Sequence, residues 1–192
     1  MVPVTDSMTG RLLVATPALA DPNFERSVIF LVDHDEDGAL GVILNRPTSV
    51  DVGAILPPWE GRTTRPGVVF RGGPVGQDSA LALARLVKPS ADGDEEPVGF
   101  RRVFGALGLV DLDAPPDLLG PDLAAMRVFA GYAGWSPGQL EDEVAEGSWF
   151  VVASVPGDAF SDEPKQLWRA VLRRQVGELA MVATFPEDPS LN

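Results

Sequence analysis

An acidic segment at residues 33–38, Asp-His-Asp-Glu-Asp-Gly, carries several possible metal ligands. It has acids at positions 1, 3 and 5 and a glycine at position 6, as a calcium-binding EF-hand loop does. The twelfth position of such a loop should be a bidentate Glu, but Leu44 stands there, and a strand is predicted where the loop's exiting helix should be. The pattern therefore favours an acidic hairpin turn. Mg²⁺ needs only one or two carboxylates plus water, so Asp33, Asp35 or Asp37 leaves a magnesium-dependent hydrolase or transferase open.

The histidine and cysteine content of the chain limits the chemistry that it can perform. His34 is the only histidine, which excludes a site with two or three His ligands in one chain. The absence of cysteine excludes a thiolate nucleophile, a disulfide framework and an iron–sulfur cluster. His34 could act as the base of a Ser–His–Asp triad, but no Gly-x-Ser-x-Gly elbow is present, so a structural role is favoured. We assign no catalytic residue, metal or cofactor, and the balance leans away from an enzyme.

Two polar loops follow predicted strands and could hold an anion. Asn45 and Arg46 end one strand before Pro47, and Arg71 ends another before a glycine-rich turn whose backbone amides could form a nest. The predicted ligand-binding residues are Asn45, Arg46, Arg71, Gly72 and Gly73. The alternative is that the glycines serve the turn alone and that the arginines pair with surface acids such as Asp33 or Asp35.

The overall charge argues against a nucleic-acid partner. Acidic residues number 28 and basic residues 15, so the net charge is −13, and this field repels a phosphate backbone. Lys165, Arg169 and Arg173 form one basic stripe at helical spacing, for which a solvated face is favoured. Glu141, Glu143 and Glu146 could supply an acid–base pair, but they too fit surface charge. No apolar run approaches the roughly 18 residues of a membrane span and no signal peptide is apparent, so a cytoplasmic protein without membrane association is expected.

Short apolar segments separated by turns predict a single α+β domain with many short strands and two or three helices. Strands are expected at residues 11–15, 27–33, 39–44, 68–71, 80–86, 100–104 and 149–154, and residues 124–131 favour a strand over a helix. Helices are expected at 50–56, from Ser136 to about Glu146, and at 163–176. Ser136 is the predicted N-cap, with Pro137 at N1 and Gln139 at N3 of a capping box. Residues 90–97 are an expected acidic loop.

The tryptophans are expected to differ in exposure. Trp135, Trp149 and Trp168 lie in or beside apolar patterns and are predicted to be core anchors. Trp59 follows two prolines in a polar segment and is predicted to be exposed.

Several segments together resemble the YqgE/AlgH family of bacterial proteins. They are Leu-Val-Ala-Thr-Pro-Ala-Leu at 13–19, Asp-Pro-Asn-Phe at 21–24, Ser-Val at 27–28, Gly-Ala-Leu-Gly-Val-Ile-Leu-Asn-Arg-Pro at 38–47, Gly-Gly-Pro-Val at 72–75 and Gly-Tyr-Ala-Gly-Trp-Ser-Pro-Gly-Gln-Leu-Glu-Asp-Glu at 131–143. The last segment is long enough to be specific. The resemblance spans about residues 10–180 and predicts one domain over 1–192 with flexible ends, while residues 88–97 and 185–192 depart from the family pattern.

The resemblance implies a fold more than a function. It implies a bifurcated sheet folded into a pseudo-barrel, with no established reaction and a frequent label of transcriptional regulator, linked to alginate in one branch. The family-motif residues Gly131, Tyr132, Trp135, Gly138, Gln139 and Glu141 are expected to be structural. Three hypotheses remain: a non-enzymatic binding or regulatory protein for a small anionic ligand or a protein partner, a carboxylate- or magnesium-dependent hydrolase or transferase, and a DNA-binding regulator. The oligomeric state is not indicated.

Overall fold

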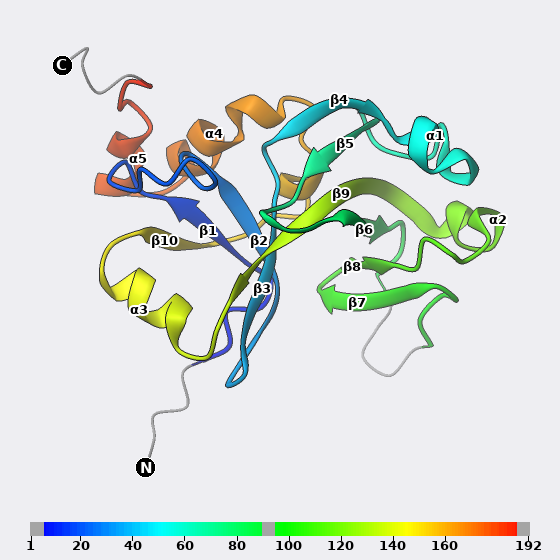
Figure 1. The fold of residues 1–192 in the computed structure, drawn as a ribbon, viewed down its shortest axis with the longest axis horizontal. Helices are drawn as coiled ribbons and strands as arrows, with labels where there is room; N and C mark the ends of the chain where they lie inside the picture. The colour runs from blue at the N-terminus through cyan, green and yellow to red at the C-terminus, as the bar shows by residue number, and fades with distance from the viewer. Residues whose placement is uncertain (1–5, 90–94, 188–192) are drawn as a thin grey trace.

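One curled sheet organises the chain in a computed structural model, which describes residues 6–89 and 95–187 (Figure 1). Within these residues the sheet has ten strands, of which eight follow the order β10-β1-β2-β3-β9-β6-β8-β7, while β5 pairs with β9 and β4 pairs with β5. The strands are β1 (Arg11–Ala15), β2 (Val28–Asp35), β3 (Gly38–Ile43), β4 (Pro47–Asp51), β5 (Val68–Arg71), β6 (Val75–Leu86), β7 (Phe100–Phe104), β8 (Leu107–Val110), β9 (Leu123–Trp135) and β10 (Trp149–Ala153).

The long strand β9 divides the sheet in two. Its last residues pair with β3 at Ala133–Trp135, while its first part pairs antiparallel with β6 and, at Phe129 and Ala130, parallel with β5. The bifurcated, curled sheet expected from the family resemblance is therefore confirmed. The segment of ambiguous period at 124–131 is a strand because it has hydrogen-bonded neighbours on both sides, which suits its Val128 and Phe129.

The turn between β5 and β6 is rich in glycine because its backbone passes close to the backbone of β9. A Cβ on Gly72 would lie 2.2 Å from the carbonyl oxygen of Gly131, and one on Gly73 would lie 2.1 Å from the backbone of Tyr132. Gly131 itself has φ 72°, a left-handed conformation that a side chain disfavours. These glycines let β5 and β6 cross β9 at the point where the sheet divides.

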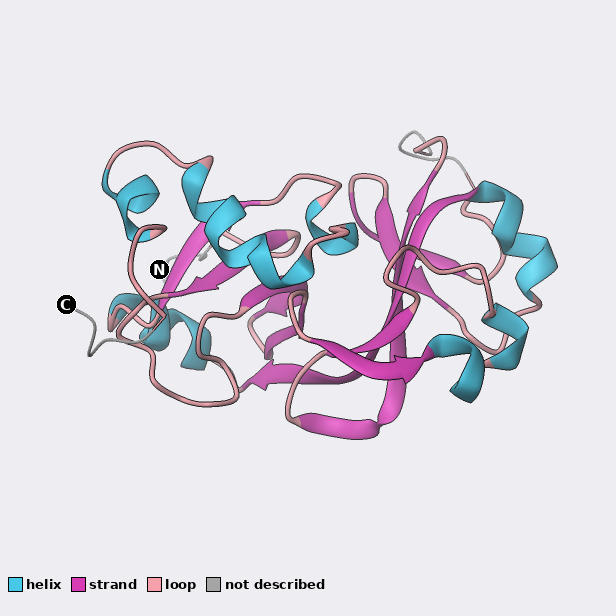
Figure 2. Cartoon of the chain, turned by 90° about the horizontal axis from the view of Figure 1, so that it is seen from above, coloured by secondary structure: helices cyan, strands magenta, loops and turns pink. Residues whose placement is uncertain are grey.

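Short helices cover the two ends of the sheet. They are α1 (Val52–Ile55), α2 (Pro116–Leu119), α3 (Gln139–Ala145), α4 (Leu167–Arg173) and α5 (Glu178–Val182), with 3₁₀ turns at Pro57–Trp59, Gly120–Asp122, Asp158–Phe160 and Pro164–Gln166. Figures 1 and 2 show α3, α4 and α5 around the part of the sheet that holds β1 and β10, and α1 and α2 at the opposite end. No helix among the described residues is both long enough and apolar enough to cross a membrane.

The helix predictions need three corrections. Residues 50–56 contain the end of β4 before the short α1, because β4 pairs with β5. The helix expected at 163–176 is a 3₁₀ turn followed by α4, which ends at Arg173. Ser136 is not the N-cap: α3 begins after Gly138, whose φ of 77° turns the chain, and no side chain caps it. Only the reverse half of the capping box forms, in which Gln139 Oε1 accepts a 3.0 Å hydrogen bond from the Ser136 amide.

Trp59 is the clearest error of the sequence-based core. Its side chain is 1% exposed, because the turn at Pro57–Trp59 folds the ring into a cluster with Met126 and Val128. The indole Nε1–H donates a 3.0 Å hydrogen bond to the Leu112 carbonyl. Trp135, Trp149 and Trp168 are buried as predicted. Polar neighbours in sequence hid the burial of Trp59, since its apolar cluster is drawn from several other elements, among them β5, β6 and β9.

The sequence pattern did not predict β8, α2 or α5, which are short and lack a strong period. The acidic loop expected at 90–97 lies outside the described residues over 90–94. Of the flexible ends expected on either side of a core at about 10–180, residues 1–5 and 188–192 also lie outside them.

Candidate functional site

The acidic segment forms the turn between β2 and β3. Asp35 pairs with Gly38 across the hairpin, and Asp35 Oδ1 accepts a 2.8 Å hydrogen bond from the Asp37 amide. The predicted hairpin is thus confirmed, and local hydrogen bonding accounts for one of its carboxylates. Among residues 6–89 and 95–187, no group of three or more His, Asp or Glu side chains is arranged to hold a metal ion.

Both ring nitrogens of the buried His34 are occupied. Its Nδ1 accepts a 2.9 Å hydrogen bond from the Met8 amide, so Nε2 carries the proton and donates to Glu141 Oε1 at 2.8 Å. A hydrogen bond from the Glu141 backbone amide lowers the pKa of this carboxyl, burial opposes that effect, and His34 lowers it further. His34 therefore fastens α3 and the N-terminal segment to the hairpin, and neither nitrogen is free to activate a nucleophile.

A second cluster on α3 uses the family motif. Glu143 Oε2 accepts hydrogen bonds from Nε1 of Trp135 at 2.9 Å and of Trp149 at 2.8 Å, and Glu143 Oε1 accepts one from Gln139 Nε2 at 2.9 Å. Phe24 packs on both indole rings. We call Trp135, Gln139, Glu143 and Trp149 the indole–carboxylate cluster. Because both carboxylate oxygens and both indole donors are satisfied, this cluster holds α3 against the sheet.

The two predicted ligand loops lie side by side. The Arg71 amide donates a 2.8 Å hydrogen bond to the Arg46 carbonyl, and the Ile43 amide donates one of 2.8 Å to the Gly72 carbonyl. The residues of the two loops differ in exposure, however. Gly72 and Gly73 are buried against β9, whereas Arg71 is exposed beside Arg46.

Among the described residues, neither Arg46 nor Arg71 forms an ion pair with Asp33 or Asp35. Arg46 bonds to two backbone carbonyls, and the surface acids that act on its charge are Glu25 and Asp21.

Asn45 and Arg46 open onto a hollow of about 200 Å³ that gathers cations. Four cationic and two acidic side chains line it, together with one amide and one indole. The lining residues are Glu25, Arg26, Asn45, Arg46, Lys165, Trp168, Arg169 and Glu187. We call this the basic hollow. The residues that line the basic hollow come from the turn before β2, the link from β3 to β4, the 3₁₀ turn and first residues of α4, and the segment after α5.

Arg26 is one of the four cations that line the basic hollow. Its guanidinium carbon is 4.4 Å from the Trp168 ring centroid, and its Nη2 donates to the carbonyls of Phe185 and Pro186. Its φ is 52°, the only positive φ of a non-glycine residue in the described part of the chain, and such a conformation marks a strained position. Asn45 holds it there, since Asn45 Nδ2 donates to the Arg26 carbonyl at 2.8 Å and Asn45 Oδ1 accepts from the Val28 amide at 3.0 Å.

The guanidinium groups of Arg46 and Arg169 also have internal partners, whereas Lys165 has none among the described residues. Arg46 donates to the carbonyls of Pro22 at 3.1 Å and Glu25 at 2.9 Å. Arg169 donates to the Ala183 carbonyl and approaches Glu187 Oε1 at 4.0 Å. The exposed Lys165 has no hydrogen-bond or ion-pair partner among the described residues.

Burial and like charges act together on these arginines. Burial lowers the pKa of Arg26, and the nearby Arg169 lowers it further against the opposing effect of Glu187 and Glu25. Burial also lowers the pKa of Arg46, with a second contribution from Arg71. Like charges crowded at a partly desolvated place are costly unless an anion joins them.

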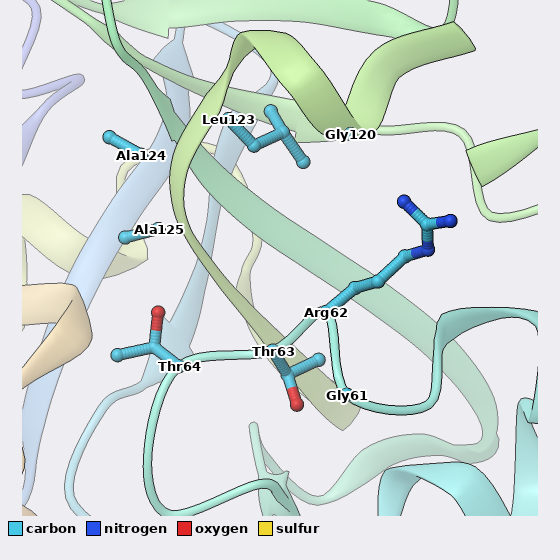
Figure 3. A pocket seen from close by; sticks show the side chains of 8 residues that line it. All are labelled: Gly61, Arg62, Thr63, Thr64, Gly120, Leu123, Ala124 and Ala125. Carbon is cyan, nitrogen blue, oxygen red and sulfur yellow. The ribbon is translucent and has the colours of Figure 1, made fainter. Parts of the chain in front are cut away.

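A different hollow, of about 290 Å³, lies between residues 61–64 and residues 120–125 (Figure 3). Its one cation, Arg62, extends toward Gly120 and away from Thr64 and is already paired with Asp117. Thr64 Oγ1 accepts a 3.1 Å hydrogen bond from the Met126 amide. Arg62 and Thr64 thus have internal partners, whereas Lys165 of the basic hollow has none among the described residues.

Sequence reasoning found Asn45 and Arg46 but missed their neighbours. The helical spacing of Lys165 and Arg169 favoured a solvated face, although both lie close to Trp168 in the sequence, and this closeness was a usable signal. Arg26 carried no local signal, because its left-handed backbone and its contact with Trp168 arise only from folding.

Comparisons with known proteins agree with the sequence resemblance. The AlgH-like family model, DUF179, matches residues 12–180. This chain belongs to the AlgH-like family. Among its relatives, a UPF0301 protein of Streptomyces coelicolor is 67% identical over 186 residues, covering 97% of this chain and 96% of the relative. A UPF0301 protein of Thermobifida fusca is 52% identical, with shares of 97% and 96%.

Two solved structures are similar to the structure of this chain. A crystal structure of a protein from Corynebacterium diphtheriae matches with a TM-score of 0.84 and 34% identity, covering 92% of both chains. The solution structure of the AlgH protein from Pseudomonas aeruginosa matches with a TM-score of 0.69 and 26% identity, covering 98% of both chains. The function of the AlgH-like family is uncharacterised, so function must be argued from the site.

Proposed function

We propose that this protein is a non-enzymatic binding protein that takes a small anionic ligand, a carboxylate or a phosphate, in the basic hollow. The observation that carries the proposal is the meeting of Arg26, Arg46, Lys165 and Arg169 around one concavity in a chain of net charge −13. An arrangement that runs against the charge of the whole molecule has to be held by specific packing.

The donors of the basic hollow outnumber its acceptors. Each guanidinium offers five N–H donors and the Lys165 ammonium three, whereas the two lining carboxylates belong to Glu25 and Glu187. Carboxylates and phosphates accept such charge-assisted bonds, often two at a time from one arginine. A bound anion would also relieve the mutual repulsion of Arg26 with Arg169 and of Arg46 with Arg71.

The basic stripe supports binding in the hollow more than binding to DNA. Arg169 folds back toward Trp168 and the Ala183 carbonyl, and Lys165 lines the hollow. The neighbouring Arg174 forms an ion pair with Asp158, with Nη2 2.7 Å from Oδ2. The stripe therefore does not present a continuous row of free cations to a phosphate backbone. A regulatory role, if the protein has one, would follow from sensing the ligand.

The proposal has two further parts, which concern the enzymatic alternative and the location in the cell. The enzymatic alternative has less support, because His34 and Glu143, which could act as an acid or a base, are engaged in packing α3. We also propose a cytoplasmic location, for which the cysteine-free composition is the support, because it suits a reducing compartment.

Two charge reversals test the proposal as a matched pair. Lys165→Glu places a carboxylate in the basic hollow, and Arg173→Glu makes the same charge change at an exposed site on α4 outside the hollow. Neither side chain has a partner among the described residues, so both variants should fold. Binding of inorganic phosphate and citrate is measured by calorimetry and by thermal shift, against sodium chloride of equal ionic strength.

We expect phosphate or citrate to bind the unaltered protein and to raise its melting temperature. Lys165→Glu should weaken that binding at least tenfold, and Arg173→Glu should change it less than twofold. Equal losses in both variants would indicate non-specific attraction. No anion-specific effect in the unaltered protein would overturn the proposal.

A further inference from the structure

A second hollow adjoins the basic hollow and differs from it in character. It has a volume of about 180 Å³ and shares Glu25, Arg26 and Glu187 with the basic hollow. Its remaining lining is Thr16, Pro17, Leu19, Phe185 and Pro186. We call this the apolar hollow. The shared residues make the two hollows parts of one depression, with Arg26 at the boundary.

Apolar groups form most of the wall of the apolar hollow. Pro17 is exposed, Leu19 is half-buried, and the Phe185 side chain is 45% exposed, so apolar surface faces the space. The one hydroxyl of the wall, on Thr16, donates a 2.8 Å hydrogen bond to the Gly147 carbonyl. The charged groups of its lining, Glu25, Arg26 and Glu187, are those shared with the basic hollow, so the rest of the wall suits an apolar group.

Arg26 can serve both parts at once. Its guanidinium lies on the Trp168 ring on the basic side and donates to the Phe185 and Pro186 carbonyls, which hold the wall of the apolar side. A guanidinium has a charged edge for an anion and a flat, weakly hydrated face that tolerates apolar neighbours. An anionic group held by Arg26 and Lys165 would therefore have its substituent directed along the depression.

The chain itself shows which chemistry fits this depression. Phe185 and Pro186 line the apolar hollow, and the next residue, Glu187, lines both hollows and approaches Arg169 at 4.0 Å. An apolar group followed by a carboxylate thus already lies along the two hollows. A ligand of the same pattern would match the same walls.

We propose that the ligand class is an amphipathic anion, with a phosphate or carboxylate head in the basic hollow and a short alkyl or aryl group in the apolar hollow. This inference rests on the proposed function and adds the identity of the non-ionic part. Each buried methylene contributes enough transfer free energy to raise affinity about fourfold. The affinity should stop rising once the apolar hollow is filled.

A homologous series measures that contribution directly. Inorganic phosphate and the ethyl, butyl and hexyl monophosphates are titrated into the full-length protein by calorimetry at one ionic strength, below the concentrations at which the esters aggregate. We expect the dissociation constant to fall about threefold to fourfold per methylene over the first members.

Leucine substitutions locate the apolar contact. Leu19→Ser removes part of the wall, whereas Leu118→Ser makes the same change at a 61% exposed residue of α2, at the opposite end of the sheet. Leu19→Ser should flatten the chain-length series and leave inorganic phosphate binding within twofold. Leu118→Ser should change neither. Because Leu19 also packs on the core, Phe185→Ser is a second variant expected to flatten the series without loss of folding.

The outcomes separate this inference from the proposed function. Phosphate binding with no gain along the series would overturn the amphipathic class and leave the anion site standing. No binding of any member would overturn both. A chain-length gain that survives both Leu19→Ser and Phe185→Ser would place the apolar contact elsewhere and overturn the assignment to the apolar hollow.

Discussion

The indole–carboxylate cluster on α3 and the basic hollow beside α4 both combine charged groups with tryptophan, yet their polar groups are satisfied differently. In the cluster, Glu143 receives two indole N–H groups and Gln139, so each donor meets an acceptor. In the basic hollow four cations face two carboxylates, and Lys165 has no partner among the described residues. A saturated network is suited to holding a fold, whereas surplus donors are suited to receiving a ligand.

The residues that stand out in the sequence hold the fold together, whereas the candidate binding residues do not stand out. The motif at 131–143 carried the family resemblance, and its side chains fasten α3 to β2, β9 and β10. The residues of the basic hollow are inconspicuous and scattered. The comparison predicts that substitutions in the cluster change stability without changing anion binding, and that substitutions in the hollow do the reverse.

Glu143→Ala should have the largest effect on stability. It leaves the Nε1–H donors of Trp135 and Trp149 unpaired, and each unsatisfied buried donor costs about 1–3 kcal/mol, so we expect a loss of about 2–6 kcal/mol in urea denaturation. Glu143→Gln keeps an acceptor and should lose less. A stable Glu143→Ala variant, or one with selectively weakened phosphate binding, would contradict the comparison.

Glu141→Gln should reveal a pH-dependent contribution of about 1 kcal/mol, the size expected of a carboxylate in the first turn of a helix. The pKa of Glu141 is lowered from its ordinary value of 4.5, so the unfolded state binds the proton more readily. The stabilisation is therefore complete above pH 4.5 and is lost as the pH falls through the folded-state pKa. Denaturation of both proteins at pH 7 and pH 3 checks this, and a difference that grows toward acid would refute it.

Gln139→Ala and Ser136→Ala form a pair that tests how α3 begins. Gln139 bonds both the Ser136 amide and Glu143, so its loss should cost about 1 kcal/mol. The Ser136 side chain caps nothing, so its loss should cost less than about 0.5 kcal/mol. Equal costs in equilibrium denaturation would restore Ser136 as the cap.

Lys165→Ala should have the smallest effect on stability, within about 0.5 kcal/mol, because the side chain is exposed and lacks a partner in the described part of the chain. Phosphate affinity should nevertheless fall. A destabilised Lys165→Ala variant with normal phosphate binding would make Lys165 part of the packing and remove the contrast with the cluster.

The core of the fold could be predicted wherever local pattern and tertiary role agree. The strands at Val28–Asp35 and Gly38–Ile43 follow from apolar runs and from the Asp-Gly turn between them, which brings neighbouring segments together without a distant partner. Trp59 shows the opposite case, since its polar surroundings in sequence indicated exposure, while an apolar cluster that includes residues of β5, β6 and β9 buries it. Ser136 failed for a related reason: Gly138 turns the chain before the helix starts.

By itself the sequence determined the family, the strand-rich α+β class and the acidic surface, because each of these is carried by contiguous segments or by composition. Only the tertiary structure decided the candidate site. Arg26, Arg46, Arg169 and Glu187 come from segments far apart in the chain and meet because β2, β3 and α4 pack together. Coulombic interaction and desolvation depend on distance in space, so the lowered pKa values of Arg26 and Arg46 have no counterpart in any local pattern.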